Sequence, residues 1–268
     1  MKWTSRIALG AAFAASLAAV TPAMADLKIG LAAEPYPPFA SQDATGKWVG
    51  WEVDFAEALC AEVKEKCEIV ATAWDGIIPA LTSKQIDVIV ASMLVTEKRK
   101  EVIDFTQFYY DTPPAIIGAK NGDMDASADH MKGKTLGVQV STGHERYASK
   151  YLVPSGVELK TYSTQDEANN DLAAGRLDYV LANSSALYDF LDTDQGKGCC
   201  ELKSIVDKPK DDPGIYGEGV GAGVRKEDTA LKDKLNAAIS AMAKAGKFDE
   251  ITAKYPQLVG KMTLPKAN

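Results

Sequence analysis

The sequence predicts an α/β fold with largely parallel sheets. Short runs rich in β-branched residues alternate with amphipathic helical stretches along most of the 268 residues, which is the pattern of strand–helix–strand units. Hydrophobic residues make up 46% of the chain, and this is enough for an ordinary globular core. The length fits either one large domain or two lobes of ordinary size.

The first 25 residues are predicted to be a signal peptide. Lys2 and Arg6 give it a positive start, residues 7–20 are apolar, and Ala-Met-Ala at 23–25 is a small-x-small cleavage site. The apolar stretch is too short for a transmembrane helix, which takes roughly 20 residues. Cleavage leaves Asp26 first, and because this is not Cys we expect an exported protein without a lipid anchor, free in solution.

The chain is acidic. It has 37 Asp and Glu residues against 30 Lys and Arg residues, two of which lie in the predicted signal peptide, so the remainder carries a net charge of −9. An acidic surface disfavours binding to nucleic acid and to anionic membranes. We therefore expect neither as a partner.

A first set of elements is expected in the N-terminal part of the chain. They are strands at 27–31, 68–71 and 86–91 and helices at 53–63 and 76–81. The longer helix is predicted because Phe55, Leu59 and Val63 recur on one face.

A second set follows Pro113 and Pro114. It consists of strands at 115–118, 135–140, 157–162 and 177–181 and of C-terminal helices at 228–245 and 247–255. Ser163, with Asp166 three residues later, is expected to open a further helix that Gly175 closes. Residues 208–223 are rich in Pro, Gly and charge, which predicts a crossing segment.

The four cysteines form two close pairs. Cys60 and Cys67 have a spacing that suits a local disulfide in an oxidising compartment. A zinc site is not expected, because no C-x-x-C motif is present and only two histidines could help. Cys199 and Cys200 are adjacent. Two free thiols, a vicinal disulfide and a bond between chains are all compatible with that arrangement.

Short motifs follow one another along nearly the whole chain after residue 25. They are YPPF at 36–39, GWEVDF at 50–55, WDGIIPAL at 74–81, IDVI at 86–89, TEKR at 96–99, GVQVST at 137–142, GRLD at 175–178 and GVRKED at 223–228. In this order they resemble the polar amino-acid family (family 3) of periplasmic solute-binding proteins. The pattern is most similar to the lysine/arginine/ornithine-binding and opine-binding (nopaline, octopine) members.

The resemblance implies a periplasmic-binding-protein type II fold, in which two α/β lobes are joined by two crossovers and a ligand binds in the cleft between them. Lobe one would comprise residues 26–111 and 217–268, and lobe two residues 112–216. Ligand contacts from both lobes stabilise the closed form of such a hinge. The spacing of Cys60 and Cys67 also resembles a disulfide of this group.

The resemblance assigns the ligand carboxylate to Arg99, whose guanidinium offers two parallel donors. Ser141 and Thr142 precede a predicted helix, so Thr142 would bind the same carboxylate from lobe two. Without the motif, Arg99 reads as a solvated charge and Thr142 as an ordinary helix cap.

Tyr36 and Trp74 match two aromatic walls that enclose the ligand side chain, although from sequence alone both read as core aromatics. Glu34 lies close to where the family has an acid that meets a basic side chain. His144 is expected on a helix surface, away from the ligand.

Two positions depart from the lysine/arginine/ornithine-type pattern. Leu94 and Asn183 replace a Ser and an Asp that bind the α-ammonium group, whereas Ser92 remains available. Losing a carboxylate opposite a buried ammonium costs on the order of 2–5 kcal/mol. The opine binders are similar to this chain in having Asn at the second position. We therefore predict a modified amino acid, opine-like or N-substituted, ahead of Lys, Arg or His.

The resemblance implies a receptor of an ATP-driven (ABC) importer, with an amino-acid-like ligand and the inner-membrane permease as partners. We expect a monomer without cofactor or metal. The main alternative is an enzyme, because cyclohexadienyl dehydratases share the fold. Only Glu34 is an obvious acid–base candidate, and no nucleophile–base pair is apparent. A sensory domain is a third alternative, but such domains are usually fused to a transmembrane segment, which we do not expect.

Overall fold

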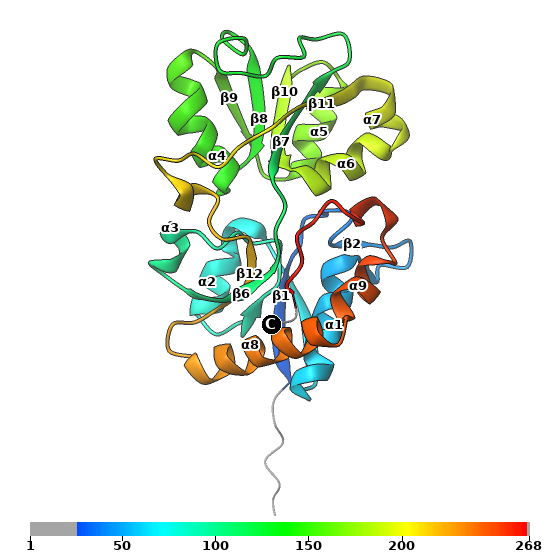
Figure 1. Ribbon diagram of the computed structural model, residues 1–268, viewed down its shortest axis with the longest axis vertical. Helices are drawn as coiled ribbons and strands as arrows, with labels where there is room; N and C mark the ends of the chain where they lie inside the picture. The colour runs from blue at the N-terminus through cyan, green and yellow to red at the C-terminus, as the bar shows by residue number, and fades with distance from the viewer. Residues whose placement is uncertain (1–25, 267–268) are drawn as a thin grey trace, which may run out of the picture.

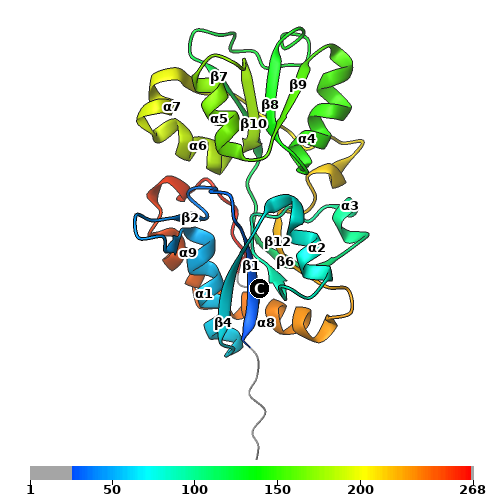
Figure 2. The same ribbon diagram turned by 180° about the vertical axis from the view of Figure 1, so that it is seen from behind.

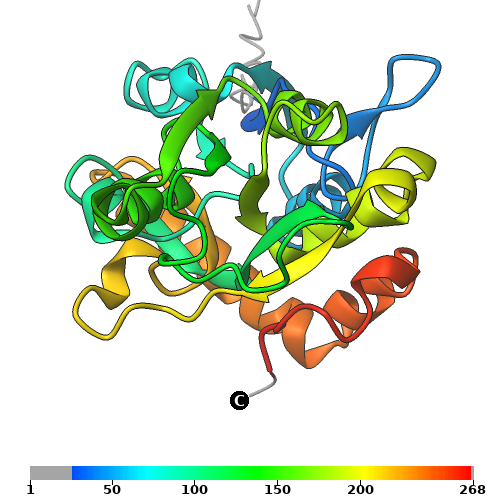
Figure 3. The same cartoon turned by 90° about the horizontal axis from the view of Figure 1, so that it is seen from above.

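The computed structural model describes residues 26–266, which form two α/β lobes stacked along the long axis of the molecule (Figures 1 and 2). Figure 3, viewed along that axis, shows one lobe lying over the other. The predicted signal peptide lies outside the described residues. Within residues 26–266, no helix is long and apolar enough to cross a membrane.

The first lobe is built on a five-stranded sheet. In spatial order its strands are β4 (Cys67–Thr72), β1 (Leu27–Ala32), β5 (Val88–Ile89), β12 (Val220–Val224) and β6 (Asp104–Tyr110). β1 runs parallel to β4 and β5, whereas β12 runs antiparallel to β5 and β6. A small hairpin of β2 (Ser41–Gln42) and β3 (Trp48–Val49) lies beside this sheet.

The second lobe has a five-stranded sheet of its own. Its strands are, in spatial order, β11 (Cys200–Ile205), β7 (Pro114–Ala119), β10 (Tyr179–Asn183), β8 (Thr135–Gln139) and β9 (Glu158–Tyr162). β8 is parallel to β9 and β10, and β7 is antiparallel to β10 and β11.

Nine α-helices cover the sheets in the described part of the chain. They are α1 (Trp51–Val63), α2 (Ile77–Thr82), α3 (Glu97–Lys100), α4 (Gly143–Tyr147), α5 (Gln165–Ala173), α6 (Ser184–Asp192), α7 (Asp194–Cys199), α8 (Thr229–Lys244) and α9 (Lys247–Thr252). Short 3₁₀ turns include Trp74–Gly76 and Pro213–Ile215, and a π-helical turn, Ala148–Leu152, extends α4.

The cores follow from this layering. In lobe one, α1, α8 and α9 bury their apolar faces together, and Phe55 stacks on Tyr109 with ring centroids 4.2 Å apart. On the opposite face of the sheet, Ile77 and Leu81 of α2 pack against Ile89 of β5. α5 and α6 cover one face of the lobe-two sheet. Burial of this apolar surface is the main force that holds each lobe together.

The predicted α/β class is confirmed, but the sheets are mixed rather than largely parallel. Four of the eight strand pairings in the two large sheets are antiparallel. The antiparallel pairings arise where the chain enters or returns to a sheet, through β7, β11 and β12. The strands β2, β3, β6, β11 and β12 and the helices α6 and α7 were not predicted as elements.

The cap of α5 also differs from the prediction by one residue. Thr164, not Ser163, is the N-cap, and its hydroxyl accepts from Glu167 N–H while the Glu167 carboxylate accepts from Thr164 N–H. This is a capping box of the expected kind.

The chain crosses between the lobes twice, between β6 and β7 and between β11 and β12. These crossings bracket the predicted lobe boundaries, which stay a prediction. The C-terminal segment adds contacts at the same place. Asp111 and Thr263 form an antiparallel bridge, with N–H···O distances of 2.8 Å in both directions. Gln257 Nε2 donates to Asp189 of α6 at 3.2 Å, and the Lys261 ammonium lies 4.4 Å from the centre of the Tyr188 ring.

Both cysteine pairs are joined in the structure. Cys60 and Cys67 form the predicted disulfide, with Cα atoms 6.1 Å apart, and connect the end of α1 to the start of β4. Cys199 and Cys200 form a vicinal disulfide between α7 and β11. Of the three arrangements that the sequence left open, the structure therefore has the vicinal bond.

Gly217, in the second crossing, is a position where only glycine fits. Its φ is +62°, and an added Cβ would lie 1.7 Å from the Val95 carbonyl oxygen. Gly46 has a similar φ of +83° but open space around it. The left-handed conformation alone costs a non-glycine residue about 1–2 kcal/mol.

We expect Gly217→Ala to lower the free energy of unfolding by about 3 kcal/mol and Gly46→Ala by about 1 kcal/mol, because only Gly217 adds a backbone clash to the conformational cost. Urea denaturation of both variants measures this difference. Equal losses would contradict the steric argument.

Candidate functional site

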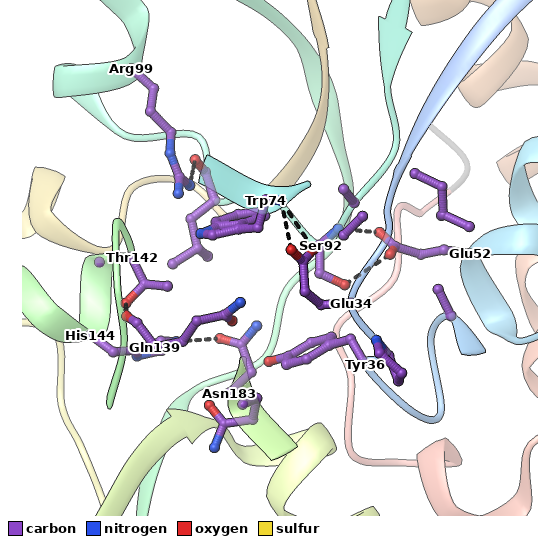
Figure 4. A pocket seen from close by; sticks show the side chains of 18 residues that line it. Glu34, Tyr36, Glu52, Trp74, Ser92, Arg99, Gln139, Thr142, His144 and Asn183 are labelled. Atoms are coloured by element: carbon purple, nitrogen blue, oxygen red, sulfur yellow. Dashed lines mark hydrogen bonds between the residues drawn. The ribbon is translucent and has the colours of Figure 1, made fainter. Parts of the chain in front are cut away.

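A pocket lies between the two lobes (Figure 4). Both sheets contribute to it, because the loops that follow β1, β5, β8 and β10 meet there. The residues that line it are Leu31, Ala32, Glu34, Pro35, Tyr36, Ala40, Glu52, Trp74, Ala91, Ser92, Leu94, Arg99, Gln139, Thr142, Gly143, His144, Gln165 and Asn183.

Arg99 is held at one end of the pocket. It lies on α3, whose N-cap is Thr96, and only 9% of the residue is exposed. Its guanidinium donates to the carbonyl oxygens of Leu94 at 2.9 Å and Ser141 at 3.0 Å. Burial, with Arg146 nearby, lowers the pKa of Arg99 to about 9. The group is therefore charged at neutral pH, and the N–H groups not used in these bonds can reach an anion.

Trp74 joins the lobes above this guanidinium. Its indole Nε1 donates to Val140 O of lobe two at 3.0 Å, and its ring lies 5.2 Å from the Arg99 carbon Cζ. Its backbone N–H donates to both carboxylate oxygens of Glu34, at 3.0 and 3.2 Å. The side chain is thus fixed as a flat wall, and the lobes are closed.

The turn after β8 presents backbone groups to the pocket. Thr142 is the N-cap of α4; its hydroxyl accepts from Glu145 N–H at 3.1 Å and donates to Gln139 O at 2.8 Å. The hydroxyl is therefore occupied within its own turn, and a ligand would meet the free N–H groups at the helix start instead. An added Cβ at Gly143 would lie 2.8 Å from Ile215 O and 3.2 Å from Leu94 Cδ1, so glycine permits this close approach of the lobes.

His144 lies inside the pocket, so its predicted place on a helix surface is wrong. The residue is 6% exposed, and its Nε2 lies 3.2 Å from Asn183 Oδ1. Burial lowers its pKa from 6.5 to about 4; the bond to Asn183 opposes this shift, and the charge of Arg99 adds to it. The ring is therefore neutral at physiological pH. His144 lies in the pocket and not on the predicted surface because α4 begins at the lobe interface.

Leu94 and Tyr36 complete the walls. On either side of Leu94, Met93 O accepts from Gly221 N–H of β12, and Val95 N–H donates to the carbonyl oxygen of Gly219, just before β12. The amide groups of Leu94 therefore point the other way, where its carbonyl accepts from Arg99. Tyr36 stacks on Phe39 with centroids 5.9 Å apart, and burial raises the pKa of its phenol above the usual value.

A second acid, Glu52, lies at the base of the pocket and is 1% exposed. Its carboxylate accepts from Ser92 N–H at 2.6 Å, from Ser92 O–H at 2.9 Å and from the Tyr109 hydroxyl. Figure 4 shows Arg99 and Thr142 on one side of the pocket and Glu34, Ser92 and Glu52 on the other. The pocket is thus basic at one end and acidic at the other.

Eight of the nine ligand-binding residues predicted from sequence line this pocket. They are Glu34, Tyr36, Trp74, Ser92, Leu94, Arg99, Thr142 and Asn183. The ninth, Ser141, has an exposed side chain outside the lining and takes part only through its carbonyl. The prediction missed the side chains of Glu52, Gln139, His144 and Gln165. Glu52 lies on the helical face that Phe55, Leu59 and Val63 share, and an acid on that apolar face was an available signal that Glu52 is buried. No cluster of three metal-binding side chains occurs within residues 26–266.

Comparison with known proteins adds to this geometry. Residues 27–257 match the profile of the bacterial extracellular solute-binding proteins, family 3. The chain is 42% identical to the L-arginine-binding protein of Pseudomonas aeruginosa over 253 residues, covering 93% of this chain and 96% of that protein. It is 35% identical to the lysine/arginine/ornithine-binding periplasmic protein of Escherichia coli, covering 82% and 84%. The solved structure of an ancestral arginine-binding protein bound to arginine is similar with a TM-score of 0.76 at 32% identity, covering 86% of this chain and 98% of that one.

The depressed pKa of His144 predicts a pH dependence of stability. Between about pH 6.5 and pH 4 the unfolded chain binds a proton at this site that the folded chain does not. Stability is therefore fully present above pH 6.5 and is lost as the pH falls through this window. Between pH 7 and pH 5 we expect the wild type to lose about 2 kcal/mol more than His144→Gln.

Urea denaturation at the two pH values measures this loss. The matched control is His130→Gln, because the His130 side chain is 51% exposed and its 2.8 Å pair with Asp125 lies at the surface, where such pairs contribute little. The control should behave like the wild type. A His144→Gln variant with the same pH dependence as the wild type would contradict the assignment of a buried, neutral ring.

Proposed function

The chain belongs to the bacterial extracellular solute-binding proteins, family 3, as its motifs predicted, and from this premise we propose that it captures an amino-acid-like ligand for an ABC importer. The observation that carries the proposal is the closed pocket between the lobes, with Arg99 at one end and Glu34 at the other. Such a pocket matches a molecule with a carboxylate at one end and a cationic group at the other.

The protein is a binding protein rather than an enzyme, as are the curated relatives that it resembles. The cyclohexadienyl dehydratase alternative therefore receives no support from them. Export through the predicted signal peptide, contact with an inner-membrane permease and a monomeric state are further parts of the proposal. They are consistent with the family's extracellular role.

In the proposed binding mode, the ligand carboxylate meets the Arg99 guanidinium and the N–H groups at the start of α4. The aliphatic part lies between Tyr36 and Trp74, whose flat faces suit a methylene chain. A basic side chain reaches Glu34 at the far end. The names of the relatives support this choice, because arginine, lysine and ornithine all have basic side chains.

The finer proposal concerns the ligand's α-nitrogen, which would lie near Leu94 and Asn183. Neither residue carries a charge, and the Asn183 carbonyl oxygen already pairs with His144. A primary ammonium there would lack a carboxylate, which disfavours it in a desolvated cleft. A nitrogen that bears a substituent with its own carboxylate, as in an opine, brings a counter-charge with it. We therefore place arginine-derived opines ahead of arginine itself.

A thermal-shift screen tests both levels. The protein without residues 1–25 is freed of carried-over ligand by partial unfolding and refolding, and is then mixed with L-amino acids, octopine, nopaline, betaines and prephenate. Ligand at 100 times its Kd adds about 2.7 kcal/mol, which raises Tm by several degrees. We expect the largest shift with the opines. A shift with L-arginine or L-lysine alone would keep the receptor and contradict the finer proposal, whereas no shift anywhere would contradict both.

Asn183→Asp tests the finer proposal directly. An Asp oxygen can accept the same bond from His144 and adds a charge opposite the α-nitrogen. We expect the Kd of L-arginine, measured by calorimetry, to fall by tenfold or more, since such a charge pair is worth about 1.5 kcal/mol at least. Octopine should gain less. The matched control, Asn170→Asp, adds the same charge to an exposed residue of lobe two and should change neither Kd.

A further inference from the structure

Glu52 is a buried acid in the first turn of α1, and no part of the proposed binding mode uses it. A carboxylate in such a place is costly unless hydrogen-bond donors surround it. Three donors do so here: Ser92 N–H, Ser92 O–H and Tyr109 O–H. Burial raises the pKa of Glu52, and these donors oppose the shift. Groups that all donate fit an ionised carboxylate, which can only accept.

The same bonds determine what Ser92 can offer a ligand. Its backbone has a φ of 50°, in the left-handed region, and Glu52 binds both its N–H and its hydroxyl hydrogen. The Ser92 oxygen is therefore left with lone pairs only. A group that binds it from the pocket must be a donor.

The acidic end of the pocket also contains more negative charge than its own partners neutralise. The groups that donate to Glu34 and Glu52 are backbone N–H groups and hydroxyls, all of them neutral. The cation that lines the pocket, Arg99, lies at the opposite end. The carboxylates of Glu34 and Glu52 therefore have no cation among the groups that donate to them, and a ligand could supply one.

We propose that Glu52 is a positioning and specificity-determining residue: through Ser92 it makes the base of the pocket an acceptor site for a ligand's guanidinium or ammonium group. The inference rests on the proposed function and deepens it. Glu34 meets the cation at the rim, and Glu52 adds a second negative charge behind the hydroxyl that the cation contacts.

Glu52→Gln tests this role with a pair of probes that differ only in charge. L-Arginine has a guanidinium where L-citrulline has a neutral ureido group of nearly the same shape, and octopine is an N-substituted form of arginine. Calorimetric Kd values are measured for all three with the full protein lacking residues 1–25. We expect the variant to bind arginine and octopine about tenfold to a hundredfold more weakly, and citrulline within about threefold of the wild type. A purely structural role would weaken all three alike.

Three further variants make the outcome decisive. Glu52→Asp keeps the charge and should retain the preference for guanidinium ligands. Ser92→Ala removes the acceptor together with one of the three donors to Glu52 and leaves the Ser92 N–H and Tyr109 bonds in place. It should reduce that preference, even if Glu52→Gln fails to fold. Glu57→Gln removes one charge from an exposed position of the same helix and should have no effect.

The possible failures are distinguishable. A wild type that binds none of the three ligands overturns the proposed function and this inference with it. A wild type that prefers the guanidinium ligands, with Glu52→Gln and Ser92→Ala variants that keep the preference in full, overturns only the role of Glu52.

Discussion

The closed arrangement depends on two hydrogen bonds that cross from lobe one to the turn after β8. Trp74 Nε1 donates to Val140 O, and Arg99 Nη2 donates to Ser141 O. A neutral hydrogen bond contributes roughly 0.5–1.5 kcal/mol net, and one to a charged group about 1.5–3 kcal/mol. Bonds of this size favour closure without making it irreversible. They also fix Trp74 and Arg99 relative to lobe two, so that the other pocket side chains can contact a ligand at defined distances.

The buried charges of the pocket explain why closure and binding belong together. Arg99 is almost fully desolvated, and its visible partners are carbonyl oxygens rather than a carboxylate. Glu52 at the other end is in the complementary position, with hydroxyl and N–H partners but no cation. Neutral dipoles alone stabilise each charge, and each charge is stabilised further when an opposite charge binds beside it. A bipolar ligand therefore stabilises both ends of the same cleft at once.

The sequence predicted much of this site because its motifs are local. Arg99 follows its cap Thr96 by three residues, and Trp74 opens a short turn, so both could be placed from neighbouring residues. What the sequence could not reveal depends on long-range contacts. Glu52 meets Ser92 across 40 residues, and Ser141 acts through a backbone carbonyl that any residue would supply. The antiparallel strand β12 likewise pairs with β6, more than a hundred residues earlier in the chain.

The C-terminal segment has a mechanical consequence. It leaves lobe one after α9, pairs with Asp111 beside the first crossing, and contacts Asp189 and Tyr188 of lobe two. In the described chain this segment is thus a further link between the lobes, besides the two covalent crossings and the bonds of Trp74 and Arg99 across the cleft. A rotation of lobe two about the long axis would strain the contacts between this segment and α6. The segment should therefore resist twisting more than the two crossings would alone. We therefore expect the lobes to open by bending at the crossings rather than by rotating about the long axis, and a fluorophore on this segment would report that bend.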